Sequence, residues 1–160
     1  IPVREIDVAR VERVLENDPF VLNADVFVDA KNQVHIEIDQ RVPILRIIDK
    51  NGLNYYIDKF GMKMPLSKHF TARVLVATGN IPPYDPQFLQ RKKHILKDLF
   101  ELTNIILKDD FLLPMMEQIY VTESKEYELS PVIGDQKILF GNLDHIDDKI
   151  FYLKIFLKHL

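Results

Sequence analysis

The residues best placed for chemistry are the acidic and histidine side chains of residues 144–148, Asp-His-Ile-Asp-Asp. Carboxylate and imidazole groups this close together could hold a divalent cation, so a small hydrolase with an Asp–His site around Asp144 is one hypothesis. Metal-binding loops usually need a glycine at the bend, and this segment has none. The segment also opens a predicted helix, where acidic residues are favoured by the helix dipole and as caps. We therefore interpret the cluster as a helix start.

Nucleophilic and phosphate-binding groups find no suitable setting either. The sequence has no cysteine, which excludes a thiol nucleophile, a thiolate metal ligand and a disulfide framework. Ser67, Ser124 and Ser130 lie outside any glycine-flanked strand-to-helix turn of the kind that exposes a catalytic serine. The five glycines form neither a phosphate-binding loop nor a dinucleotide fingerprint. The sequence therefore predicts a protein that is not an enzyme and that has no cofactor or metal site.

The charge pattern argues against a nucleic-acid partner. The formal net charge is −3 over 160 residues and the pI is about 6.0, while Lys and Arg alternate with Asp and Glu almost everywhere. The densest basic run, residues 91–94, falls within a predicted helix and is interpreted as its solvated face. At 28% charged and 47% apolar residues, the chain can fold around a core.

The first 45 residues are predicted to form a helix followed by a β-hairpin. Residues 8–15 carry apolar side chains at helical spacing, after Asp7 as an N-cap and before Pro19 as a stop. Residues 22–28 and 34–38 then alternate apolar and polar side chains around a polar turn, which is typical of a hairpin. The alternation directs the apolar residues of the second run inward: Val34, Ile36 and Ile38.

A second domain is predicted over residues 46–160, with the boundary in the region 42–52. Pro43 cannot sit in the middle of a central strand, and the residues after it form several short apolar runs that predict strands: 44–48, 53–57, 61–64 and 73–77. Asp85 and Pro86 favour the start of a long helix over residues 86–107. Three further strands are predicted at 119–121, 127–132 and 137–140. The chain is therefore α+β, with a mixed or antiparallel sheet and two long helices.

The last helix is predicted from Ile146 to Leu160 and has an unusually wide apolar face. Phe151, Ile155 and Phe156 extend it beyond a single stripe. This helix is either deeply buried or in contact with something outside the chain. A chain with several hairpins also exposes strand edges, which can recruit an extended partner strand. Tyr127 lies near such an edge, and both core packing and partner contact stay open for it because tyrosine is amphipathic.

The succession of local motifs resembles the FtsQ/DivIB family of bacterial cell-division proteins. Residues 11–21 resemble the helix and "P-hydrophobic-V" step of a POTRA module, and residues 36–44 (IEIDQRVPI) are similar to the family's "I-x-I/V-x-E-R-x-P-V" exit. Residues 55–61 (YYIDKFG) resemble its "y-x-I/V-D-x-x-G" hairpin. Leu129, then residues 138–141 (ILFG) with Lys149 and Leu153, resemble "v-x-L-G…K-L". These motifs follow in the family's order along nearly the whole chain.

The resemblance implies a truncated POTRA domain over residues 1–45 and a β domain over residues 46–160. It implies a non-catalytic scaffold at the periplasmic face of the inner membrane that links early and late division proteins. The implied partners are FtsB and FtsL, bound when a partner strand pairs with the last strand of the β domain near the end of the C-terminal helix, and FtsK, which is associated with the POTRA part. Lys125 and Tyr127 occupy the positions of a basic and an aromatic residue in the strand that supplies charge contacts, and are the implied partner-binding residues.

Two departures from the family pattern stand out. The strand and helix that normally open a POTRA module are missing before Ile1, and the final strand, which is the family's main partner-binding edge, is missing after Leu160. The second departure would leave the apolar helix from Ile146 to Leu160 under-covered. No run of about 20 apolar residues is present, and the chain begins at Ile1, so a single membrane anchor is expected outside it. Another POTRA-bearing protein, of outer-membrane assembly or secretion, stays an alternative, although the tandem repeats or barrel strands usual there are not seen.

Overall fold

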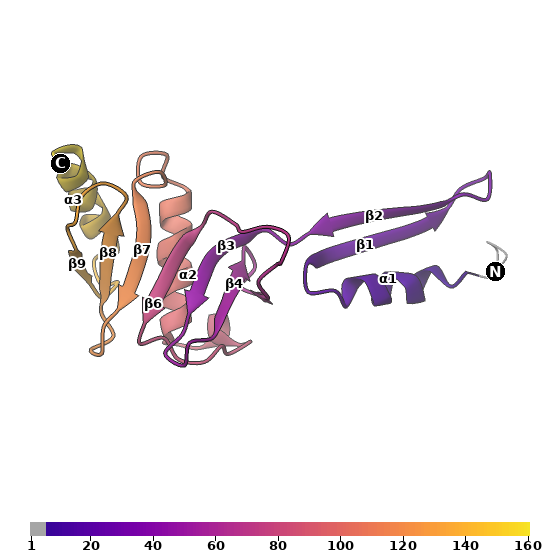
Figure 1. Cartoon of the computed structure of the whole chain (residues 1–160), viewed down its shortest axis with the longest axis horizontal. Helices are drawn as coiled ribbons and strands as arrows, with labels where there is room; N and C mark the ends of the chain where they lie inside the picture. Colours follow the sequence, from indigo (N-terminus) through magenta and orange to yellow (C-terminus); the bar gives the residue numbers. More distant parts are fainter. Residues whose placement is uncertain (1–5) are drawn as a thin grey trace. The chain divides into compact units, whose positions relative to one another are not determined.

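The computed structural model describes residues 6–160 and divides the chain into two compact units, Ile1–Val42 (unit 1) and Pro43–Leu160 (unit 2). Figure 1 shows unit 1 as a helix with a hairpin and unit 2 as a larger sheet with helices. We predicted the boundary between residues 45 and 46. The α+β class, with a helix and hairpin followed by a sheet domain, is confirmed.

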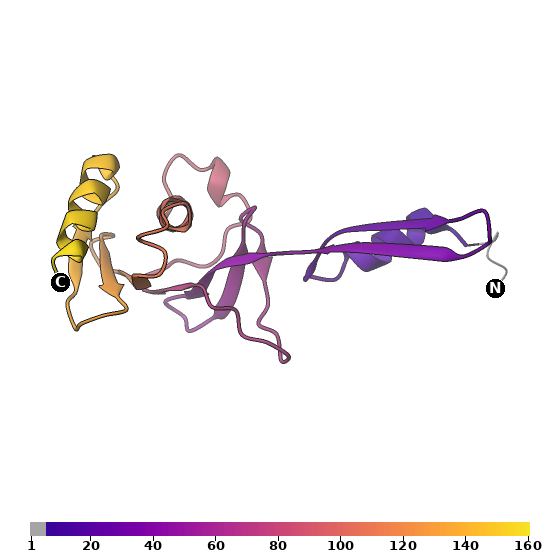
Figure 2. The same cartoon turned by 90° about the horizontal axis from the view of Figure 1, so that it is seen from above.

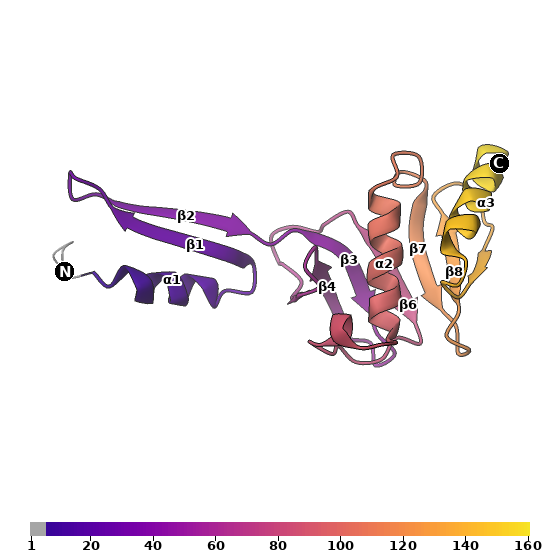
Figure 3. The ribbon, with the colours of Figure 1, turned by 180° about the vertical axis from the view of Figure 1, so that it is seen from behind.

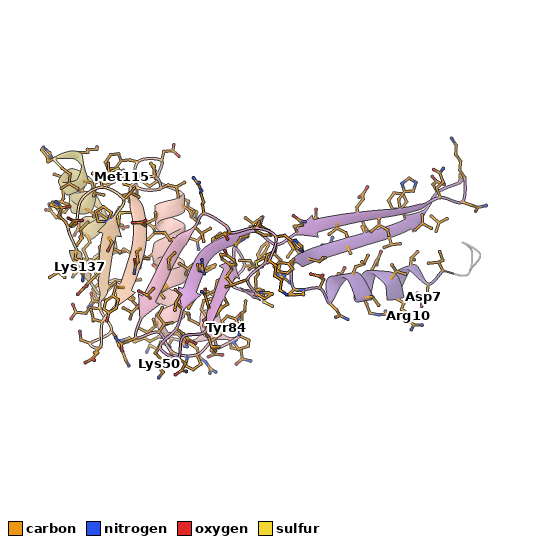
Figure 4. All side chains as sticks on the ribbon, viewed as in Figure 1. Asp7, Arg10, Lys50, Tyr84, Met115 and Lys137 are labelled. Carbon is orange, nitrogen blue, oxygen red and sulfur yellow. The ribbon has the colours of Figure 1, made fainter. Side chains whose placement is uncertain are left out.

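Unit 1 contains α1 (Val8–Glu16), β1 (Val21–Val28) and β2 (Val34–Gln40). As predicted, Asp7 caps α1, because its Oδ1 accepts a hydrogen bond from the backbone N–H of Arg10 at 3.2 Å. Figure 4 labels both residues at the start of the helix. β1 and β2 pair antiparallel, which confirms the predicted hairpin.

One prediction for unit 1 is wrong: the apolar row of β2 does not point into a core. Val34, Ile36 and Ile38 are 38%, 53% and 45% exposed, whereas Ala24 and Val26 of β1 are buried. The reason is that α1 packs against β1 and leaves the β2 half of the same face uncovered. Alternation identified the apolar face correctly but could not say how much of it is covered.

Unit 2 is built on a seven-stranded mixed sheet with the order β5-β4-β3-β6-β7-β8-β9. β3 pairs parallel with β6, and β6 pairs parallel with β7, while all other neighbours are antiparallel. The strands are β3 (Pro43–Ile48), β4 (Asn54–Asp58), β5 (Lys63–Met64), β6 (Leu75–Gly79), β7 (Met116–Val121), β8 (Tyr127–Pro131) and β9 (Ile138–Gly141). Pro43 is the first residue of its strand, the position at which a missing N–H is tolerated.

Two buried aspartates shape the turns on either side of β4. Asp49 Oδ1 accepts hydrogen bonds from the backbone N–H groups of Asn51 and Leu53, and Asp58 Oδ1 does the same for Phe60 and Met62. Each turn contains a glycine with positive φ, +82° and +87°, a conformation that glycine adopts without strain. The repeated Asp-Lys-x-Gly sequence therefore forms the same turn twice.

Both long helices of unit 2 lie on one face of the sheet. Figure 2 shows α2 (Ile95–Leu107) end-on, and Figure 3 shows α2 and α3 (Ile146–Lys158) together in front of the strands. Leu99 and Leu102 of α2 are 0% exposed and meet the apolar side of the central strands in one core cluster. The helices therefore cover one face of the sheet, and α3 packs against the end of the sheet that carries β9.

The helix predicted over residues 86–107 is wrong in its first half. The structure has a short 3₁₀ helix, Phe88–Gln90, and α2 begins only at Ile95. His94 is extended and its Nδ1 accepts a hydrogen bond from the N–H of Leu96 at 3.0 Å, so it acts as the N-cap. Because this cap starts a new helix, the basic run at residues 91–93 lies in a loop, where Arg91 contacts Asp85 at 2.8 Å.

The start of α3 also differs from the prediction in one respect. Asp147 and Asp148 lie in the first turn as expected, but the N-cap position is His145, which has a φ of +56° and makes no side-chain capping bond. Asp144 instead donates its backbone N–H to Oδ1 of Asn142 at 3.0 Å. The acidic residues at this end therefore act through the helix dipole and not through a side-chain cap.

Candidate partner-binding surface

β9 is the outermost strand at one end of the sheet. Its single strand neighbour within residues 6–160 is β8. Lys137 precedes it and is labelled at this end of the sheet in Figure 4. An edge strand presents unpaired backbone N–H and C=O groups, which can bond to an added extended chain.

A shallow groove of about 260 Å³ lies beside this edge, between β9 and α3. The lining residues of α3 are spaced i, i+3, i+4 and i+7, which places them on one helix face. Leu139 is 79% exposed and Tyr152 is 66% exposed. The groove is lined by Ile138, Leu139, Phe140, Lys149, Tyr152, Leu153 and Phe156.

Contacts at the beginning of α3 hold the helix against β9. Nζ of Lys149 donates to the backbone carbonyl of Asn142 at 2.7 Å and lies 5.6 Å from the centroid of the Phe140 ring. Leu153 and Leu157, on the inner side of the helix, are buried in the core. The exposed groove residues of α3 therefore lie on a helix that is held against unit 2 by these contacts.

A salt bridge connects the C-terminal half of α3 to the segment after α2. Nζ of Lys154 lies 2.8 Å from Oδ2 of Asp109. This hydrogen bond is the main reason that the pKa of the Asp109 carboxyl is held below its ordinary value of 3.8. α3 is thus attached to unit 2 by both polar and apolar contacts.

The arrangement has the two components of a strand-binding site. The free edge of β9 can supply backbone hydrogen bonds, and the groove can receive side chains that project from alternate positions of an added strand. A surface with Leu139, Phe151, Tyr152 and Phe156 all more than 40% exposed is typical of an interaction site.

Comparison with known families places this domain. The family model described as "FtsQ/DivIB, C-terminal related" matches residues 42–160, which begin at the boundary between the two units and include the groove. The chain belongs to the FtsQ/DivIB C-terminal-related family. It is thereby related to the bacterial cell-division proteins FtsQ and DivIB. No curated protein matches the chain significantly.

Lys125 of this FtsQ/DivIB-related chain lies in the β7–β8 turn, just before β8. Its φ is +63°, and its backbone N–H donates to the carbonyl of Thr122 at 3.0 Å. Its side chain is exposed and lines a shallow pocket together with Asn142 and Asp144, which follow β9. The family resemblance placed Lys125 within the strand, whereas the structure places it in a turn near the end of the edge strand.

Tyr127 opens β8 and is a core residue. Its side chain is 1% exposed, and its hydroxyl donates a hydrogen bond to Oδ2 of Asp98 on α2 at 2.7 Å. Burial, together with the hydrogen bond to Asp98, raises the pKa of the Tyr127 phenol. The sequence left core packing and partner contact open for Tyr127, and its side chain is packed in the core. Its hydrogen bond to Asp98 connects β8 to α2.

Sequence reasoning did not single out Leu139 of β9 and Tyr152 of α3, the two most exposed residues at the groove. The available signal was the wide apolar face of the last helix.

Across the described part of the chain, no three His, Cys, Asp or Glu side chains gather where they could bind a metal ion. This holds for Asp144 and His145 as well. None of the helices between residues 6 and 160 has the length and apolar character that crossing a bilayer requires.

Proposed function

We propose that this chain is a non-catalytic extracytoplasmic scaffold of the bacterial divisome, and that the edge of β9 and the α3 groove bind an extended segment of an FtsB/FtsL-type partner. The proposal is carried by one observation: within residues 6–160 the outer edge of β9 has no strand partner, and it lies beside an exposed apolar groove. Family membership supports the division role. By the same relation, the chain works at the periplasmic face of the inner membrane, and FtsK is a further possible partner of the POTRA-like unit 1.

Two favourable contributions to binding are available at this position. Burying a large apolar side chain contributes about 1.5–3 kcal/mol, and Leu139 and Tyr152 offer most of their surface for burial. Each added backbone hydrogen bond contributes about 0.5–1.5 kcal/mol net. Backbone pairing supplies affinity, while the groove selects apolar residues at alternate positions of the partner.

Lys125 and Tyr127 have different parts in this proposal. Lys125 is exposed near the end of β9 and would attract a carboxylate of the partner. Tyr127 is buried and would act indirectly, because its bond to Asp98 fixes β8, the strand that carries β9.

The test replaces Leu139 by Asp and measures binding to the purified extracytoplasmic FtsB–FtsL complex of the same organism by calorimetry. We expect at least a tenfold loss of affinity with little change in melting temperature, because Leu139 is 79% exposed and its burial in the complex would be lost. Leu113→Asp is the matched control: Leu113 is 44% exposed and does not line the groove. Equal affinity for the wild type and Leu139→Asp would refute the proposed site.

The charge contact is tested separately with Lys125→Glu. We expect weaker binding, with an effect that shrinks as salt is added, because exposed charges are screened. Lys92→Glu, at an exposed lysine in the loop before α2, makes the same charge change and is expected to bind like the wild type. If the two variants bind equally well, Lys125 has no special part in the contact.

A further inference from the structure

The outer edge of β1 in unit 1 is occupied by two side chains of α1. The backbone N–H of Val26 donates to Oε1 of Glu12 at 2.9 Å, and the N–H of Ala24 donates to Oε1 of Glu16 at 3.2 Å. In an antiparallel pair, the N–H groups of alternate residues point away from the paired strand. Ala24 and Val26 are two such residues, so the carboxylates take the place that carbonyls of a further strand would occupy.

The spacing of the four residues explains how a helix can do this. Glu12 and Glu16 are four residues apart, which is about 6 Å of helix rise. Ala24 and Val26 are two residues apart, which is about 6.6 Å of strand. The two repeats therefore match, and the order is reversed because the chain turns back between α1 and β1. Carboxyl oxygens are hydrogen-bond acceptors, as the backbone carbonyls of a further strand would be.

We propose that Glu12 and Glu16 protect the β1 edge from strand addition, so that another extended chain can pair there only after α1 moves away. An uncovered edge is a template for pairing with other chains, including a second copy of this one. Ala24 and Val26 are only 3% and 4% exposed, so α1 already covers the positions that such a strand would need. This inference concerns unit 1 and does not depend on the function proposed for β9.

Amide hydrogen exchange on the 160-residue chain tests the closure. In the wild type we expect the N–H groups of Ala24 and Val26 to exchange at least tenfold more slowly than those of Ile38 and Ile36. These residues are the direct cross-strand neighbours of Ala24 and Val26. Their N–H groups also point away from the hairpin, toward the outer edge of β2, which has no further strand within residues 6–160. Equal exchange of the two sets in the wild type would overturn the proposal.

Two double variants separate the hydrogen bonds from the presence of the helix. Glu12→Ala with Glu16→Ala removes both acceptors but favours the helix, since alanine has the highest helix propensity. Without the two hydrogen bonds, α1 stays helical but is free to move away from the β1 edge. We therefore expect this variant to lose the slow exchange at Ala24 and Val26 and to self-associate in sedimentation velocity. Glu12→Gln with Glu16→Gln keeps an acceptor oxygen at each position and is expected to stay protected and monomeric. Alanine variants that keep the protection, or lose it without associating, would contradict edge protection.

Discussion

The two units of the chain differ in how they are held together. In the described part of unit 1 the buried apolar residues are Val21, Ala24 and Val26, and the whole of β2 is exposed. Unit 2 has a continuous core in which Leu99 and Leu102, among many others, are 0% exposed. A binding edge needs a rigid support to keep its geometry, and only unit 2 supplies one of this size. The comparison therefore favours β9 over β2 as the site of specific strand pairing.

The largest expected effect comes from cutting the core of unit 2. Leu102→Ala removes a fully buried side chain of α2 and should cost about 2–5 kcal/mol of unfolding free energy. All six tyrosines lie between residues 55 and 152 and the chain has no tryptophan, so tyrosine fluorescence in urea reports unit 2 alone. An unchanged midpoint would show that α2 does not carry this core.

The next effect concerns the bond that joins β8 to α2. Tyr127→Phe removes the hydroxyl that donates to Asp98 and leaves a part-buried carboxylate without this donor. We expect a loss of about 1–3 kcal/mol in the same urea measurement. Tyr152→Phe, at a tyrosine 66% exposed, should change stability by no more than about 0.5 kcal/mol. Similar values for the two variants would mean that the buried bond contributes little.

Unit 1 is tested by Val26→Ala, which removes one of its few buried side chains. Two carbon groups are lost, so the cost should be about 1–2 kcal/mol, seen as faster amide exchange in β1 and β2. Val14→Ala, at a position 62% exposed, should leave this exchange unchanged. The tyrosine-detected transition should not move in either variant. If it does move, the two units unfold together and the contrast between them fails.

The smallest effect is a pH dependence that belongs to unit 2. Partial burial is the main cause that lowers the pKa of His94 below 6.5 in the folded chain, where Nδ1 must be unprotonated to accept the N–H of Leu96. The unfolded chain therefore binds the proton at higher pH than the folded chain does. The contribution of His94 to the free energy of unfolding is fully present above about pH 6.5 and is lost as the pH drops below that value. We expect a loss below about 1 kcal/mol.

His94→Asn isolates this term, because asparagine caps a helix without titrating. Between pH 7 and pH 5 the tyrosine-detected stability of this variant should fall less than that of the wild type. His69→Asn, at an exposed loop position, should follow the wild type. A wild type and a His94→Asn variant with the same pH dependence would contradict the assignment.

Much of the fold follows from local sequence signals. The hairpin of unit 1 and the strands around Asp49 and Asp58 were predictable because alternation and turn residues agree there. The helix over residues 86–107 was not, because apolar spacing continues through Phe88 although His94 caps a new helix. Hydrophobic periodicity identifies a face, while the cap and the covering partner decide where an element starts and whether that face is buried.

The binding surface was predictable only in outline. The width of the apolar face on the last helix left two interpretations open, deep burial and contact with something outside the chain. In the structure Phe156 is 43% exposed and lines the groove. Tyr127 could not be assigned, because the burial of a tyrosine depends on a distant partner, here Asp98, 29 residues away along the chain. Alternation along β9 separates the exposed Leu139 from the buried Phe140. The 79% exposure of Leu139 could not be predicted, because it depends on β9 being the edge strand of the sheet.

The central claim is that β9 binds an extended partner strand, and amide exchange across the whole chain tests it most directly. On addition of the extracytoplasmic FtsB–FtsL complex, we predict slower exchange for outward-pointing N–H groups of Ile138–Gly141, with β5 at the opposite end of the sheet unchanged. A complex that forms while exchange in β9 stays as in the free chain would contradict the account.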